Sequence, residues 1–256
     1  MLQSKDINKI SELKNGFTHR WLEPDFILGS LKCFSFSGFC KCLAPFKVRG
    51  YSFEAIFSIL ISAGFIDAGT VNSMLNSYMG KHIEARKDTF YRLKNNPSIC
   101  WRLVLWLFAA KFRKTVEEYG EKTDSVKCIV FDDTLLAKTG RCIEKVSRVW
   151  DHVTGRFILG FKMLLMGYWD GTSFIPVDFS LHREKGRNKE KPFGLKKKEL
   201  RRQYRKQRFV VTHSYERSKE ADTGKIESAI KMFSRAITQG FKVDYLSFAS
   251  VFRPLA

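Results

Sequence analysis

Three strand-like runs in the middle of the chain constrain its fold more than any other feature of the sequence. The first run, 128–131, is short, apolar and rich in β-branched and aromatic residues, which is typical of a buried strand. Two further runs follow at 156–166 and 173–181, separated by an Asp-Gly turn signal. Together they predict an antiparallel meander whose first strand ends in two carboxylates, Asp132 and Asp133.

Short polar motifs accompany these runs. In order along the chain they are Phe131-Asp132-Asp133-Thr134, Lys138-Thr139-Gly140, Trp150-Asp151-His152-Val153-Thr154-Gly155, Gly160-Phe161-Lys162, Gly171 and Pro176-Val177-Asp178-Phe179-Ser180-Leu181-His182. In order and spacing the series resembles the first half of the catalytic domain of insertion-sequence transposases with a DDE active site. The resemblance implies an RNase H-like domain of the α/β (α+β) class, and it assigns metal binding and catalysis to Asp133.

The resemblance also implies two Mg²⁺ ions as cofactors, because this family cuts and joins DNA by two-metal phosphoryl transfer. Holding both ions takes several converging carboxylates. Ala249 stands where the family has its second Asp, and the third acid, a Glu, would come after residue 256. We therefore expect a C-terminally truncated, inactive copy, although the sequence leaves its activity as an enzyme undecided. It also leaves open whether Asp132 or Asp178 takes a metal role.

The charge of the chain predicts a polyanionic partner. The formal net charge is +19, which favours nucleic acid first and an anionic membrane surface second. Residues 183–208 hold thirteen basic residues and three acidic ones. We interpret this basic insertion as an arm, helical over 195–208, that lies along DNA phosphates; the alternative is a solvated, partly disordered loop. The residues expected to bind DNA are Lys196, Lys197, Lys198, Arg201, Arg202, Arg205 and Lys206.

The periodicity of the remaining sequence divides the chain in two. Residues 1–122 are expected to form an α-helical N-terminal region, and residues 123–256 the incomplete RNase H-like domain. The clearest helices of the first part cover 52–63, with Ser52 as the expected cap, and 97–119, which carries an aromatic stripe for packing.

Two shorter helical patterns, 70–78 and 88–94, give a weak helix-turn-helix signal. Asp88 is the expected cap of the second helix, which would then face phosphates or base edges. The alternative is a pair of packed helices whose polar face is only solvated. The N-terminal region is therefore a second candidate DNA-binding surface.

The last predicted elements are an amphipathic helix over 225–239 and a strand over 243–252. This is the order in which the resembled family places a helix and a strand after its central insertion. The residues expected on the apolar stripe of the helix are Ile226, Ile230, Phe233 and Ile237.

The composition also predicts a compartment. Six cysteines without a visible secretion signal indicate reduced thiols, and Cys33, Cys40 and Cys42 lack the partners of a zinc site. The longest apolar helical run falls far short of the roughly 20 residues that a membrane span needs. We expect a cytoplasmic, nucleoid-associated protein without a membrane partner.

Three hypotheses for function remain open. The first is a transposase-family protein that binds the DNA of insertion-sequence ends, with a homodimer or full-length transposase as its protein partner. The second is a non-catalytic, basic nucleic-acid-binding protein that interferes with full-length transposase. The third, an unrelated RNA-binding protein, explains the charge but not the series of motifs.

Overall fold

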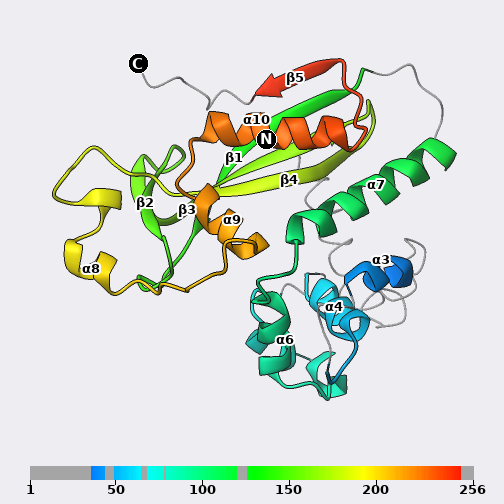
Figure 1. The fold of residues 1–256 in the computed structure, drawn as a ribbon, viewed down its shortest axis with the longest axis horizontal. Helices are drawn as coiled ribbons and strands as arrows, with labels where there is room; N and C mark the ends of the chain where they lie inside the picture. Colours follow the sequence, from blue (N-terminus) through cyan, green and yellow to red (C-terminus); the bar gives the residue numbers. More distant parts are fainter. Residues whose placement is uncertain (1–35, 44–48, 65–67, 78, 120–125, 249–256) are drawn as a thin grey trace, which may run out of the picture. The chain divides into compact units, whose positions relative to one another are not determined.

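A computed structural model of the chain describes residues 36–43, 49–64, 68–77, 79–119 and 126–248. These residues form helices and one mixed β-sheet, so the fold is of the α+β class, as the sequence predicts. The chain divides into two compact units, residues 1–99 and residues 100–256, which we describe separately (Figure 1).

The described part of the first unit is helical. Its elements are α3 (Phe36–Leu43), α4 (Phe53–Ser62), α5 (Val71–Leu75), η2 (Met79–His82) and α6 (Lys87–Lys94). Ser52 caps α4 as predicted, because its hydroxyl accepts a hydrogen bond from the N–H of Ala55 at 3.1 Å. The prediction that Asp88 caps α6 is wrong: the cap position is Arg86, whose side chain makes no capping bond. The apolar side chains buried in this unit include Phe53, Ile56, Met74, Phe90 and Leu93.

A five-stranded sheet organises the second unit. Its strands are β1 (Cys128–Ala137), β2 (Ser147–Asp151), β3 (Arg156–Trp169), β4 (Phe174–His182) and β5 (Tyr245–Phe248). The long strand β3 is antiparallel to β1 along one edge and to β2 and β4 along the other. Strand β5 lies parallel to β1, with Phe131 opposite Phe248. The predicted meander is confirmed, whereas β2 is an additional strand that no apolar run indicated.

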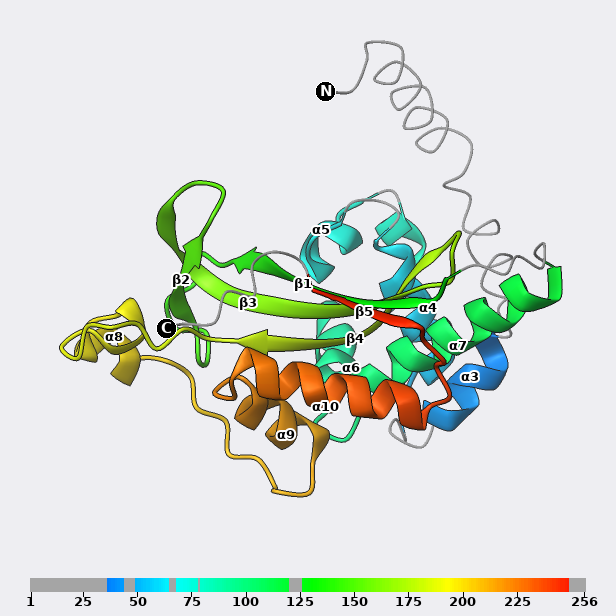
Figure 2. The ribbon, with the colours of Figure 1, turned by 90° about the horizontal axis from the view of Figure 1, so that it is seen from above.

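Two helices, α7 (Trp101–Tyr119) and α10 (Lys225–Thr238), pack on the face of the sheet toward which Ile129 and Phe131 point (Figure 2). The buried helix residues of this core are mostly small, and the aromatic side chains of Trp106, Phe112 and Phe233 pack against its margin. The boundary predicted at residue 122 assigns α7 to the N-terminal region, but the helix packs within the second unit. The buried residues of this core include Ala109, Leu164, Met166, Tyr168, Ala229, Met232 and Ala236.

The basic insertion folds onto the hairpin of β2 and β3. It contains η3 (Pro192–Gly194) and α8 (Lys197–Arg201), and α9 (His213–Glu220) follows it. Leu195 anchors the insertion, since it is 2% exposed in a small second core. The buried partners of Leu195 in that core are Val146, Leu159 and Phe161.

The predicted helix over 195–208 is wrong in extent, because only residues 197–201 are helical in this stretch. Beyond α8 the chain bonds to the loop before β2 instead of continuing the helix. The side chain of Gln203 donates to the carbonyl of Val146 at 2.7 Å, and the N–H of Tyr204 donates to the carbonyl of Cys142 at 2.8 Å. These tertiary bonds outweigh the local helix propensity.

Candidate functional site

Asp133, the predicted catalytic residue, lies on the helix-covered face of the sheet, opposite Leu164 in the ladder of β1 and β3. Its side chain is only 4% exposed. One carboxylate oxygen pairs with the ammonium of Lys225 at the start of α10, and the other lies 3.9 Å from Nζ of Lys162 on β3. The side chain of Lys162 is equally buried. Asp133 is therefore the shared counter-ion of two lysines.

The described residues do not fit the two-Mg²⁺ site that the transposase resemblance implies. Mg²⁺ needs several oxygen ligands in octahedral geometry, and the ammonium groups beside Asp133 would repel a dication. Within the part of the chain that the structure describes, no group of three or more His, Cys, Asp or Glu side chains could hold a metal. Ala249, expected in the place of the second acid, lies outside that part.

The two acids considered as substitutes do not join Asp133. Asp132 is exposed, and its Oδ1 accepts a hydrogen bond from the N–H of Asp133 at 2.8 Å. Asp178 is fully buried on β4, which is separated from β1 by β3. Its carboxylate is held by two guanidinium groups: Nε of Arg102 at 2.5 Å and Nη2 of Arg235 at 2.8 Å. Each buried carboxylate thus has its own cations.

Arg102 links α7 to both β4 and α9. Besides Asp178, it contacts the carboxylate of Glu220 at 3.0 Å and donates to the carbonyl of Phe179 at 3.0 Å. Burial acts to lower the pKa of Arg102, but the charges of Asp178 and Glu220 outweigh burial and raise it. Together with the packing of Ala109 on the sheet, these bonds attach α7 to the second unit.

His182 ends β4 inside the same polar layer. Its Nδ1 lies 3.0 Å from the carbonyl oxygen of Thr223, which can only accept, so Nδ1 carries the proton. In the neutral ring Nε2 then accepts from the hydroxyl of Ser180 at 2.7 Å. Burial lowers the pKa of His182, with the hydrogen bond to Thr223 acting in the opposite direction. The fold therefore favours the uncharged ring.

The basic insertion presents a different kind of surface. All seven residues predicted to bind DNA are exposed, and none of them forms an ion pair with another described residue. Their charges therefore face solvent. Such a surface attracts polyanions, because the counterions of a nucleic acid are released when phosphates meet lysine and arginine.

Ion pairs at both ends hold the insertion on the fold. Arg183 pairs with Asp222, and Arg208 meets the carboxylate of Glu144 through two nitrogens at 2.5 and 2.7 Å. The hydrogen bonds from Arg208 lower the pKa of Glu144. Between these ends the insertion is attached to the fold at Leu195, Gln203 and Tyr204, whereas residues 185–191 are exposed.

Comparison with protein-family models, with curated proteins and with solved structures found no match. The described helices include none that is both long and apolar enough to cross a membrane.

The sequence does not identify the two lysines that contact Asp133, Lys162 and Lys225, as its partners. Lys162 carries a detectable signal: it is a lysine at a core-facing position of an otherwise apolar strand, and buried lysines are rare unless paired. Lys225 carries none, because it is one of many exposed-looking basic residues and lies 92 positions from Asp133.

Proposed function

We propose that this protein binds duplex DNA through its basic insertion and belongs to the DDE transposase class that its motifs resemble. The observation that carries the proposal is the row of exposed, unpaired cations on a segment that the fold holds in place. A fixed array of charges loses less conformational freedom on meeting a phosphate backbone than a disordered arm does.

The order of elements supports the class and the RNase H-like fold. The meander is followed by the basic insertion, then by α10, then by a strand parallel to β1. This is the order that the resemblance implies, and it brings the strand after α10 beside the strand that carries Asp133. The proposal extends to a nucleoid-associated location and to a protein partner, either a second copy or full-length transposase.

A specific observation favours a non-catalytic role within that class. Asp133 is neutralised by Lys162 and Lys225 and so is engaged as a structural ion pair in the described residues. The second candidate function is accordingly a DNA-binding protein that occupies the sites of an active transposase without cutting them.

Fluorescence anisotropy with a labelled short duplex tests the proposal. We expect binding near neutral pH with a Kd of about 10⁻⁴ to 10⁻⁶ M at physiological salt for sequence-independent contacts. A variant in which glutamine replaces all five of Lys196, Lys197, Lys198, Arg201 and Arg202 should lose most of its affinity for the duplex. Phosphatidylserine vesicles, added as a competitor of the duplex, test the alternative of an anionic membrane surface. Failure to bind duplex at low salt, or preference for the vesicles, would reject the proposal.

A further inference from the structure

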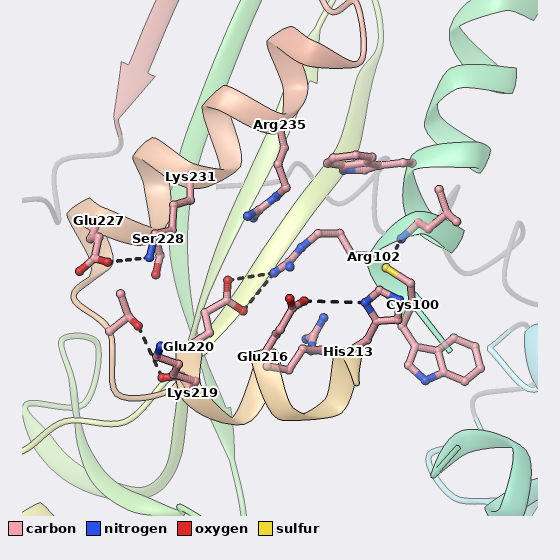
Figure 3. A pocket seen from close by; sticks show the side chains of 15 residues that line it. Cys100, Arg102, His213, Glu216, Lys219, Glu220, Glu227, Ser228, Lys231 and Arg235 are labelled. Atoms are coloured by element: carbon pink, nitrogen blue, oxygen red, sulfur yellow. Dashed lines mark hydrogen bonds and ion pairs between the residues drawn. The ribbon is translucent and has the colours of Figure 1, made fainter. Parts of the chain in front are cut away.

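A pocket of about 700 Å³ opens between α7, α9 and α10, on the helical side of β4 (Figure 3). Its volume lies within the range of roughly 300 to 1,000 Å³ that small-molecule sites occupy. None of its lining residues belongs to the basic insertion, so the pocket is separate from the DNA-binding surface proposed above. Its walls contain both apolar and charged side chains.

Four polar atoms in these walls are buried without a hydrogen-bond partner among the described residues. One of them, Nη2 of Arg235, has an ion-pair partner in Asp178 at 2.8 Å. The other three, Nε1 of Trp106, Nη1 of Arg217 and Oγ of Ser228, have no partner of either kind among those residues. Ser228 is fully buried, on the side of α10 that lines the pocket. Buried polar atoms in folded proteins are nearly always paired. Indole and guanidinium nitrogens can only donate, and a hydroxyl can donate as well. The missing partner is therefore a hydrogen-bond acceptor.

The charges around the pocket specify that acceptor further. Arg102 and Arg235 are already engaged by Asp178, and Lys231 pairs with Glu227 at 2.6 Å. Arg217, in contrast, has no ion pair with any described residue. Its Cζ lies over the ring of Phe179, 4.2 Å from the ring centroid, and its Nη1 has no hydrogen-bond partner among the described residues.

The environment of Arg217 is unfavourable for its charge. Burial lowers the pKa of Arg217, and the neighbouring charge of Arg102 lowers it further. Glu220 acts in the opposite direction, but its carboxylate is bonded to Arg102. Ordered water could satisfy the indole and the hydroxyl, but it would not neutralise a buried guanidinium. An anion would do both.

We infer that this pocket binds a small ligand with an oxyanion group, which is either a phosphate or a carboxylate. Arg217 supplies the counter-charge, and Trp106 and Ser228 supply neutral hydrogen-bond donors. The inference does not depend on DNA binding, because its residues lie outside the basic insertion.

Isothermal titration of the full chain with pyrophosphate and with succinate, at matched ionic strength, tests the inference and distinguishes the two sources of oxyanion. Arg217→Gln should weaken binding of the preferred ligand by roughly 10- to 100-fold, since it removes a charge-assisted bond. Ser228→Ala and Trp106→Phe should each weaken it by about two- to tenfold. Arg202→Gln, which removes the same charge from the exposed insertion, is the matched control and should bind as the wild type does.

Thermal unfolding separates ligand binding from folding. We expect ligand to raise the Tm of the wild type and of Arg202→Gln equally, and to raise the Tm of Arg217→Gln by much less at the same ligand concentration. If Arg202→Gln and Arg217→Gln weaken ligand binding equally, the ligand is attracted to the overall positive charge and not to the pocket. If neither ligand shows saturable binding, the pocket holds only water. A loss of duplex affinity in Arg217→Gln as large as that in Arg202→Gln would assign the pocket to nucleic-acid phosphates. Each of these results would overturn the inference. If Arg217→Gln does not fold, the Ser228→Ala and Trp106→Phe variants decide it.

Discussion

The buried acids of the second unit show how neighbours decide what a residue does. Asp133 stands at the place where the resemblance puts a metal ligand, yet its carboxylate is shared between Lys162 and Lys225. Asp178, two strands away, is held between two arginines. A carboxylate in a binding site for a divalent metal ion has other oxygen ligands as its neighbours, not cations. Both residues therefore stabilise the fold as ion pairs.

Replacing Asp133 tests this role. Asp133→Asn leaves the buried ammonium of Lys162 without a counter-ion, which should cost about 3–5 kcal/mol of unfolding free energy. Asp132→Asn, on the neighbouring exposed residue, should change it by less than about 0.5 kcal/mol. Urea denaturation measures both. An Asp133→Asn protein as stable as the wild type, or more stable, would show that the carboxylate is not a structural counter-ion.

His182 predicts a pH dependence. Its pKa in the folded chain lies below the ordinary value of 6.5, so below that value the unfolded chain binds more protons than the folded one. The contribution of His182 to stability is present above pH 6.5 and is lost as the pH falls through the folded pKa. Unfolding free energies measured between about pH 7.5 and pH 5.5 should therefore fall more for the wild type than for His182→Gln. Parallel curves would contradict the assignment of a neutral, buried ring.

At the scale of elements, periodicity predicts where a helix lies better than which side it buries. The helix predicted over 225–239 is present as α10, but the stripe expected to face the core is only partly right: Phe233 packs against the core, and the three isoleucines do not. Ile226, Ile230 and Ile237 are 61%, 61% and 45% exposed, and smaller residues such as Ala229 and Ala236 are buried in their place. Small side chains fit because Phe131, Leu164 and Met166 of the sheet already fill the space.

The seating of the basic insertion rests on a close approach at Gly194. A Cβ there would lie 2.5 Å from Cβ of Arg148, and the residue has φ +67°. Gly186 has a similar φ of +72° but has no atom closer than 3.8 Å to such a Cβ. Both alanine variants should lose about 1–2 kcal/mol through backbone strain. Gly194→Ala should lose more, because the clash also lifts η3 from β2.

Urea denaturation compares the two glycine variants, and limited proteolysis reports on the insertion itself. We expect faster cleavage within residues 183–208 in Gly194→Ala than in Gly186→Ala. Equal stability and equal cleavage of the two variants would mean that the insertion is not seated against Arg148 as the structure places it.

At the scale of the whole molecule, the sequence predicts local elements and their exposure, but it does not predict the contacts between residues far apart in the chain. The meander, the cap of α4 and the exposed cations follow from short-range patterns of residue type. The placement of α7 and the partners of Asp133 depend on contacts between residues far apart in the chain, such as Arg102 with Asp178. No spacing rule encodes those contacts, which only the packed sheet and helices bring together.

The basic residues of the chain are concentrated in one segment of the fold. Thirteen of the chain's 45 lysines and arginines lie within residues 183–208, and the fold gathers them at the hairpin of β2 and β3. Because phosphate contacts release counterions, the logarithm of duplex affinity should fall linearly with the logarithm of salt concentration.

The salt dependence of duplex binding tests the central claim, that the basic insertion is the DNA-binding surface. The double variant Arg201→Gln, Arg202→Gln should reduce the slope of log affinity against log salt by about 2, because each phosphate contact contributes about 0.9. The control is the double variant Lys114→Gln, Lys242→Gln, which removes the same charge from exposed positions outside the insertion; its slope should match the wild type. Slopes that change equally in the two double variants, or in neither, would contradict the account.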